Sequence, residues 1–144
     1  MLLSDAIRAG CAISRQVFGM LSDGNGGTCA IGAGLEGFGA QFIKGVKRLF
    51  VDNLSDLIPQ YARYNTSNLS GTTMVLCPEC DDVKDCLMCR AMHLNDYHVW
   101  SREAIADWLE EEEVKLGLRP MIPEGDTVIC RPNEVSLDLA LALC

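Results

Sequence analysis

The chain has 144 residues, of which 49% are hydrophobic, and a formal net charge of −8 at pH 7. This length suits one domain, or a domain with a small metal module, and the apolar content excludes a disordered chain. No apolar run is long enough to span a membrane and no secretory signal pattern is present, so we expect an intracellular, cytoplasmic protein. The eight cysteines then indicate metal ligands or free thiols rather than disulfides.

The N-terminal region is predicted to begin with a helix. Ser4 or Asp5 can cap this helix, which carries Ile7 and Cys11 on its apolar side. A second short helical piece is expected over residues 17–21.

A glycine-rich stretch follows, with a loop expected at 22–28 and small residues alternating with apolar ones at 29–40. Such a loop can hold phosphate through backbone amides, but the Lys-Ser/Thr pair of a P-loop is missing. Asp23 and Asn25 resemble the start of a calcium loop whose acidic end is absent. The favoured interpretation is a loop followed by a helix whose glycines permit close packing.

Residues 40–50 have the spacing of an amphipathic helix. Its basic face carries the only basic cluster in the chain, which consists of Lys44, Lys47 and Arg48. These residues are weak candidates for nucleic-acid binding, because charge runs of this kind are usually solvated helix faces.

The centre of the chain carries the pattern C-x2-C-x12-H-x4-H, formed by Cys77, Cys80, His93 and His98. This spacing is typical of a Cys2His2 zinc finger, and both histidines of the chain take part in it. Two thiolates and two imidazoles satisfy the tetrahedral preference of Zn²⁺. A regular helix would set the two histidines about 140° apart, so its last turn must loosen for both to bind.

Cys86 and Cys89 form a second C-x2-C pair inside this motif. On a helix, both would share a face with His93, so Cys89 can take the place of His98 as fourth ligand. Two further alternatives are a cluster held by four cysteines and a redox-active dithiol.

The hydrophobic core of the predicted finger is unusual. Lys84 and Arg90 stand about where an ordinary finger has its aromatic and leucine. The core must therefore come from packing on the rest of the chain or from Leu87, Met88 and Leu94.

A clear helix is predicted after the finger. Ser101 is its N-cap, Glu103 lies in the first turn where the helix dipole favours an acid, and Trp100 can staple it to the finger. The acidic run 110–113 is expected on and beyond its solvent side, and Gly117 ends it.

The chain is predicted to be mainly α with minor β. Residues 127–130 can form a short strand that pairs with 74–76, and the apolar end at 135–144 either packs in the core or meets a partner chain. The expected organisation is a helical region with a glycine-rich loop at 1–64, a linker at 65–73, a zinc-finger-like ββα module plus helix at 74–116, and an irregular segment with the apolar C-terminal element at 117–144.

Charge is divided unevenly along the chain. Residues 1–76 contain six Lys and Arg against five Asp and Glu, a net of +1, whereas residues 77–144 contain six against fifteen, a net of −9. The finger thus lies in the half that repels phosphate, which disfavours a DNA-reading role.

The segment 93–109, preceded by Cys77-Pro-Glu-Cys80, resembles a unit in small uncharacterised proteins of bacteria and their phages. The resemblance covers about a quarter of the chain and implies a shared finger-plus-helix unit, with the C-x2-C and H-x4-H residues as ligands. We therefore expect a protein of the bacterial cytoplasm, encoded by the cell or by a phage.

Three classes of function remain. The first is a non-enzymatic, zinc-stabilised protein-interaction or regulatory protein, with a structural or assembly subunit of a phage particle as its variant. The second is a nucleic-acid-binding regulator that uses the basic cluster together with Arg63, with the finger as scaffold. An enzyme ranks last, because four protein ligands leave a zinc ion no open position.

Overall fold

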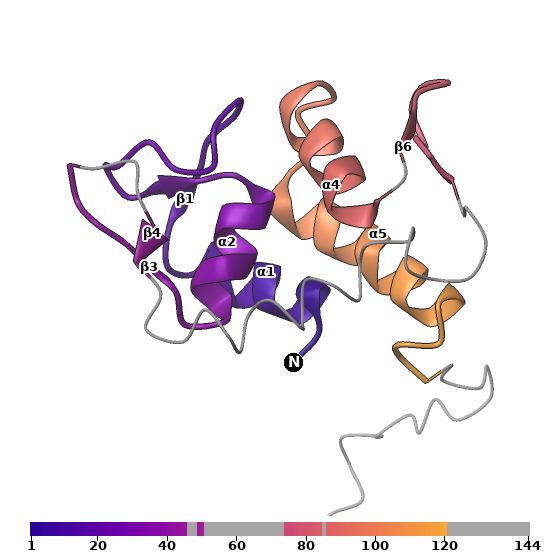
Figure 1. The fold of residues 1–144 in the computed structure, drawn as a ribbon, viewed down its shortest axis with the longest axis horizontal. Coiled ribbons are helices and arrows are strands. Elements are labelled where there is room, and N and C mark those ends of the chain that lie inside the picture. Colours follow the sequence, from indigo (N-terminus) through magenta and orange to yellow (C-terminus); the bar gives the residue numbers. More distant parts are fainter. Residues whose placement is uncertain (46–48, 51–73, 85, 121–144) are drawn as a thin grey trace, which may run out of the picture.

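The computed structural model describes residues 1–45, 49–50, 74–84 and 86–120 (Figure 1). Within these residues helices dominate over short strands, which confirms the predicted fold class of mainly α with minor β. The helices are α1 (Leu3–Cys11), α2 (Ala30–Gly37), α4 (Leu87–Asp96) and α5 (Arg102–Lys115). The strands are β1 (Arg15–Gln16), β2 (Gly27–Thr28), β3 (Gln41–Phe42), β4 (Leu49–Phe50), β5 (Val75–Leu76) and β6 (Val83–Lys84).

In the described part of the chain, the strands pair two at a time and form no larger sheet. β1 and β2 run parallel, whereas β3 with β4 and β5 with β6 are antiparallel. The β5–β6 hairpin leads into α4, which gives the ββα unit predicted from the motif. β5 pairs with β6, and the suggested pairing of β5 with residues 127–130 lies outside the described residues.

One hydrophobic core joins the N-terminal helices to the ββα unit. Leu3 of α1, Leu94 of α4 and Leu109 of α5 are fully buried in the same cluster, and Leu87 at the start of α4 is nearly so. Each such side chain contributes about 1.5–3 kcal/mol through burial. The ββα unit thus draws its core both from its own leucines and from packing on the rest of the chain, as expected.

Glycines let α1 and α2 approach very closely. A Cβ built on Gly10 would lie 1.9 Å from the carbonyl oxygen of Ala33, and one on Gly37 would lie 1.9 Å from that of Ala6. Neither distance is sterically possible, so the crossing requires both positions to lack a side chain. This geometry confirms the interpretation of the glycine-rich stretch as a loop followed by a close-packed helix.

Replacing Gly10 with alanine is expected to destabilise the protein by about 1–3 kcal/mol or more, because the added methyl forces the two helices apart. Helix propensity alone predicts a stabilisation of about 1 kcal/mol, so the sign of the change is decisive. Urea unfolding measures it, with Ala9→Gly at the neighbouring exposed position as the control for propensity. A Gly10→Ala protein more stable than the wild type would contradict the close crossing.

A buried carboxylate ties α5 to α1. Glu113 is fully buried and accepts hydrogen bonds from the Ser4 backbone N–H at 3.0 Å and from the Ser4 hydroxyl at 2.6 Å. This corrects the expectation that the run 110–113 lies wholly toward solvent. Neither Ser4 nor Asp5 caps α1, because the N-cap is Leu2 and both residues lie in the first turn.

Two segments predicted to be helical are not. Residues 17–21 contain no helix, and the stretch 40–50 holds β3 and β4 of a hairpin. Gly45 has a φ of 77°, which breaks a helix, and its N–H donates to the Gly24 carbonyl at 2.7 Å. The glycine therefore turns the chain back toward the loop, which the spacing of apolar residues does not reveal.

The helix predicted after Ser101 is confirmed as α5. The Ser101 hydroxyl accepts a hydrogen bond from the Ala104 N–H at 3.1 Å, and Glu103 lies in the first turn. The helix ends at the C-cap Leu116, and Gly117 follows with a φ of 69°.

None of the described helices has the length and apolar character needed to cross a membrane. Several expectations fall outside the described residues: those for Lys47, Arg48 and Arg63, the linker at 65–73, the strand at 127–130 and the apolar element at 135–144.

Candidate metal centre

The four residues of the motif converge where the β5–β6 hairpin meets α4. Cys77 directly follows β5, Cys80 lies in the turn before β6, His93 is on α4 and His98 follows that helix. A hydrogen bond from the Cys77 N–H to the Asp82 carbonyl, at 3.0 Å, closes the turn that carries both thiols.

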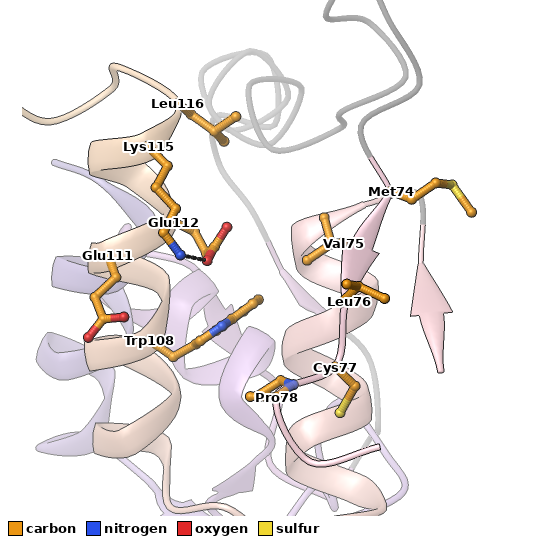
Figure 2. Close-up of a pocket in the computed structure, with 10 residues that line it drawn as sticks. All are labelled: Met74, Val75, Leu76, Cys77, Pro78, Trp108, Glu111, Glu112, Lys115 and Leu116. Atoms are coloured by element: carbon orange, nitrogen blue, oxygen red, sulfur yellow. Dashed lines mark hydrogen bonds and ion pairs between the residues drawn. The ribbon is translucent and has the colours of Figure 1, made fainter. Parts of the chain in front are cut away.

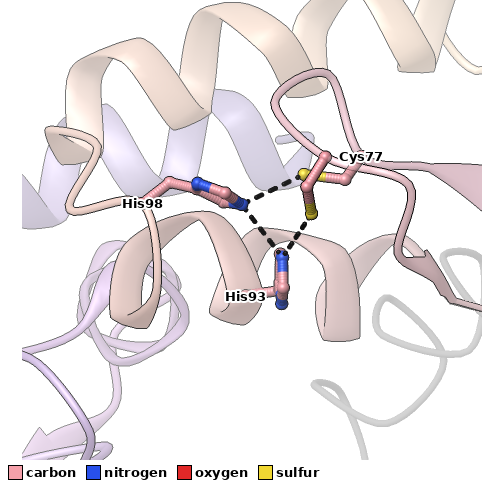
Figure 3. Close-up of side chains that lie close together, drawn as sticks. Cys77, His93 and His98 are labelled. Carbon is pink, nitrogen blue, oxygen red and sulfur yellow. Dashed lines mark hydrogen bonds between the residues drawn. The ribbon is translucent and has the colours of Figure 1, made fainter.

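Three of the distances between the ligand atoms are close to those of a tetrahedral metal site (Figure 3). Cys77 Sγ lies 3.4 Å from His98 Nε2, Cys80 Sγ lies 3.5 Å from His93 Nε2, and the two Nε2 atoms are 3.1 Å apart. A tetrahedron with ordinary zinc bond lengths has S···N edges of about 3.6 Å and N···N edges of about 3.3 Å. All four atoms lie within 4.8 Å of one another, so the cluster can hold a metal ion at its centre.

The end of α4 loosens before His98, as the spacing predicts. The helix ends at Asp96, with Tyr97 as C-cap, and Val99 adopts a left-handed φ of 56°. The Trp100 N–H then donates to the Leu94 carbonyl at 3.1 Å, which fixes the reversed chain against α4. A β-branched residue in this conformation is strained, so tertiary contacts must hold the turn that returns His98 to the cluster.

Asp82 supports the cluster from outside. Burial tends to raise the pKa of Asp82, but hydrogen bonds from Lys84 and Arg90 outweigh it and keep the pKa below its usual range. Its Oδ2 lies 3.6 Å from His93 Nδ1, on the ring side opposite the cluster. Burial lowers the pKa of His93, which favours the neutral imidazole that binds metal. Carboxylates in this position orient metal-binding histidines.

Arg90 occupies the interior of the ββα unit and is fully buried. Its guanidinium donates to the Val75 carbonyl at 2.8 Å, to the Asp82 carboxylate at 3.0 Å and also to the Asp82 carbonyl. Its Nε has no hydrogen-bond partner among the described residues. Arg90, which stands where an ordinary finger has a core leucine, thus joins α4 to β5 and to the turn between β5 and β6.

Cys86 and Cys89 do not belong to the cluster. Cys86 is buried as the N-cap of α4, and its sulfur accepts a hydrogen bond from the Cys89 N–H at 3.3 Å. The side chain of Cys89 is exposed. This placement favours the two histidines as ligands over either cysteine.

The other predicted site residues lie apart from the cluster. Lys44 is exposed in the turn after β3, on the rim of a hollow of about 320 Å³ beside the glycine-rich loop. The Asp23 Oδ1 atom accepts hydrogen bonds from the N–H groups of Asn25 (2.8 Å) and Gly27 (2.9 Å). Because this carboxylate stabilises its own loop, the structure offers no support for a calcium site there.

Sequence reasoning missed a buried polar network between the two halves of the chain. Arg102 of α5 donates to the hydroxyls of Ser14, at 3.1 Å, and Thr28, at 3.2 Å. Glu36 of α2 accepts hydrogen bonds from the same two hydroxyls. Arg102 and Ser14 are 88 positions apart, so no local pattern could have signalled the contact.

The fold and the site together define a mainly α protein that contains a ββα unit with a Cys2His2 cluster able to hold a metal ion. No protein-family model, curated protein or solved structure matches the chain.

Proposed function

We propose that the cluster binds one structural Zn²⁺ and that the chain is a non-enzymatic protein-interaction or regulatory protein. The observation that carries this proposal is the convergence of two sulfur and two nitrogen atoms within 4.8 Å of one another, with three of their separations close to those of a tetrahedral site. This donor set is the one that structural zinc sites use. The resemblance to small bacterial and phage proteins agrees with it.

The position of the cluster supports a structural role. Four protein ligands would fill the coordination sphere of zinc, whereas a catalytic site keeps one position for water or substrate. The ion would join the hairpin turn to α4 and to the chain after it. Since Cys77 and Leu94 belong to the common core, the metal would fix the hairpin against the whole molecule.

The charge of the chain supports a protein partner rather than nucleic acid. The net charge is −8, and exposed acidic residues lie along α5, at Glu103, Asp107 and Glu111. Nucleic-acid modules need a basic face that displaces counterions from phosphates. Of the predicted basic cluster, only Lys44 lies among the described residues.

Metal analysis of the purified protein tests the proposal. We expect one zinc ion per chain in the wild type, retained in Cys86→Ser and lost in His98→Ala. Cys86→Ser is a matched control because serine is a good N-cap and the change leaves the cluster intact. Zinc retained in His98→Ala but lost in Cys86→Ser would assign a different ligand set, and iron with visible colour would favour redox chemistry instead.

A further inference from the structure

A groove of about 390 Å³ runs between β5 and α5 (Figure 2). Met74, Leu76 and Pro78 line the side of the hairpin, and Trp108 extends from α5 toward them. Met74 is 54% exposed and Leu76 is 67% exposed, and both side chains point away from α5 (Figure 2). Cys77 also lines the groove, so one residue of the metal cluster belongs to its wall.

The register of the hairpin shows which backbone groups face the groove. The Cys77 N–H donates to the Asp82 carbonyl, which makes Cys77 and Asp82 a hydrogen-bonded pair of the ladder. Such pairs alternate with non-hydrogen-bonded ones in antiparallel strands, and Leu76 with Val83 is the next pair. The N–H and C=O of Leu76 therefore point away from β6, along the edge of β5 that pairs with no other strand of the described residues.

The charge of the groove favours a basic partner. Glu111, Glu112 and Lys115 of α5 lie along it, and Lys115 is paired with Glu112 at 2.6 Å. Glu111 is exposed and forms no ion pair with the described residues. The rim thus carries two carboxylates against one ammonium group beside an apolar floor, on a chain that is strongly acidic overall.

We propose that this β5–α5 groove binds an extended segment of a partner protein in which apolar side chains alternate with lysine or arginine. The segment pairs with this edge of β5 through Leu76, as in other cases of strand addition to an exposed edge. Its apolar side chains contact Trp108, and a basic side chain faces Glu111. The inference rests on the proposed function, because zinc at Cys77 would hold the hairpin wall in place.

Binding of the peptide acetyl-Lys-Val-Lys-Val-Lys-Val-amide to the full chain, followed by NMR, tests the proposal. We expect shifts concentrated at Leu76, Trp108 and their neighbours, and no binding of the peptide in which glutamate replaces each lysine. Trp108→Ala should weaken binding about tenfold or more. Glu111→Lys should weaken it several-fold, whereas the exposed Glu103→Lys outside the groove should change it less than about twofold.

A proline at position 76 separates strand addition from simple apolar contact. Leu76→Pro removes an N–H that faces away from β6, so the hairpin keeps its ladder while the partner loses its hydrogen bond. Binding should be lost in Leu76→Pro and largely kept in Leu76→Ala, with the zinc content of both variants unchanged. Equal binding by the two variants would overturn the proposal.

Other outcomes assign the groove differently. Groove signals that change with protein concentration alone would indicate a second copy of the chain, and contacts of Trp108 with residues 121–144 would indicate its own C-terminal segment. Each outcome overturns the proposed partner. A chain that contains zinc but binds no peptide would refute the groove and leave the metal site standing, whereas peptide binding without zinc would refute the metal role alone.

Discussion

Removal of the metal is expected to unfold the ββα unit while the α1–α2 pair stays folded. Apparent binding free energies of structural zinc sites are about 10–16 kcal/mol, so this is the largest single effect that we expect. The cluster joins Cys77 and Cys80 of the hairpin to His93 and His98, and β5 and β6 are only two residues long each. Two-stranded hairpins of this length are not stable alone in water. The α1–α2 crossing, by contrast, contains none of the ligands.

Near-UV circular dichroism and thermal unfolding with and without a chelator measure this effect. Trp100 and Trp108 pack against the core that α4 and α5 share, so their signal should fall when zinc is removed. Cys77→Ser is the matched control, because a chain that cannot hold the metal should not respond further to chelator. Unchanged tryptophan signal and melting temperature in the chelated wild type would show that the fold does not depend on the ion.

The metal cluster could be predicted from the sequence because its ligands are marked by residue type and by spacing. The chain has cysteine pairs separated by two residues and only two histidines. These features leave only a few ways to arrange four ligands around a metal ion. Even the loosening of the helix before His98 follows from the angle between positions on a regular helix. Spacing alone could not choose between His98 and Cys89, since both lie within reach of the metal on such a helix. The structure distinguishes them, because His98 belongs to the cluster and Cys89 does not.

The buried charges could not be predicted, because their partners are distant in the sequence. Glu113 belongs to an acidic run that resembles a solvated helix face, yet its acceptor atoms meet Ser4, 109 positions away. The hairpin at β3 and β4 was missed for a related reason. Its turn depends on the left-handed Gly45, and its apolar residues have a spacing that fits a helix equally well. Local sequence patterns predict which face of a helix is apolar, but they do not predict polar contacts between residues that are distant in the sequence.

Replacing Arg90 is the second change from which we expect a large effect. Arg90→Ala leaves a cavity in the ββα unit and removes the guanidinium from the Asp82 carboxylate and from the Val75 carbonyl. Truncating a large buried side chain typically costs about 2–5 kcal/mol, and the exposure of the Asp82 side chain, 36%, keeps the loss of the ion pair itself small. Because Asp82 also stands beside His93, metal affinity should fall by about 10–100-fold as well. Urea unfolding and competition with a chelator of known affinity measure the two losses.

Three comparison variants identify which property of Arg90 matters. Arg90→Met restores most of the volume but not the hydrogen bonds, and Arg90→Lys keeps the charge but loses the fork that reaches several acceptors at once. Arg15→Met removes an arginine whose side chain is 61% exposed beside Asp23, and it should cost less than about 1 kcal/mol. If the hydrogen bonds hold the turn in place, Met and Lys will both weaken metal binding although Met keeps more of the stability. If Arg90→Met instead binds zinc as tightly as the wild type, Arg90 serves only to fill the core, and Asp82 orients His93 without its help.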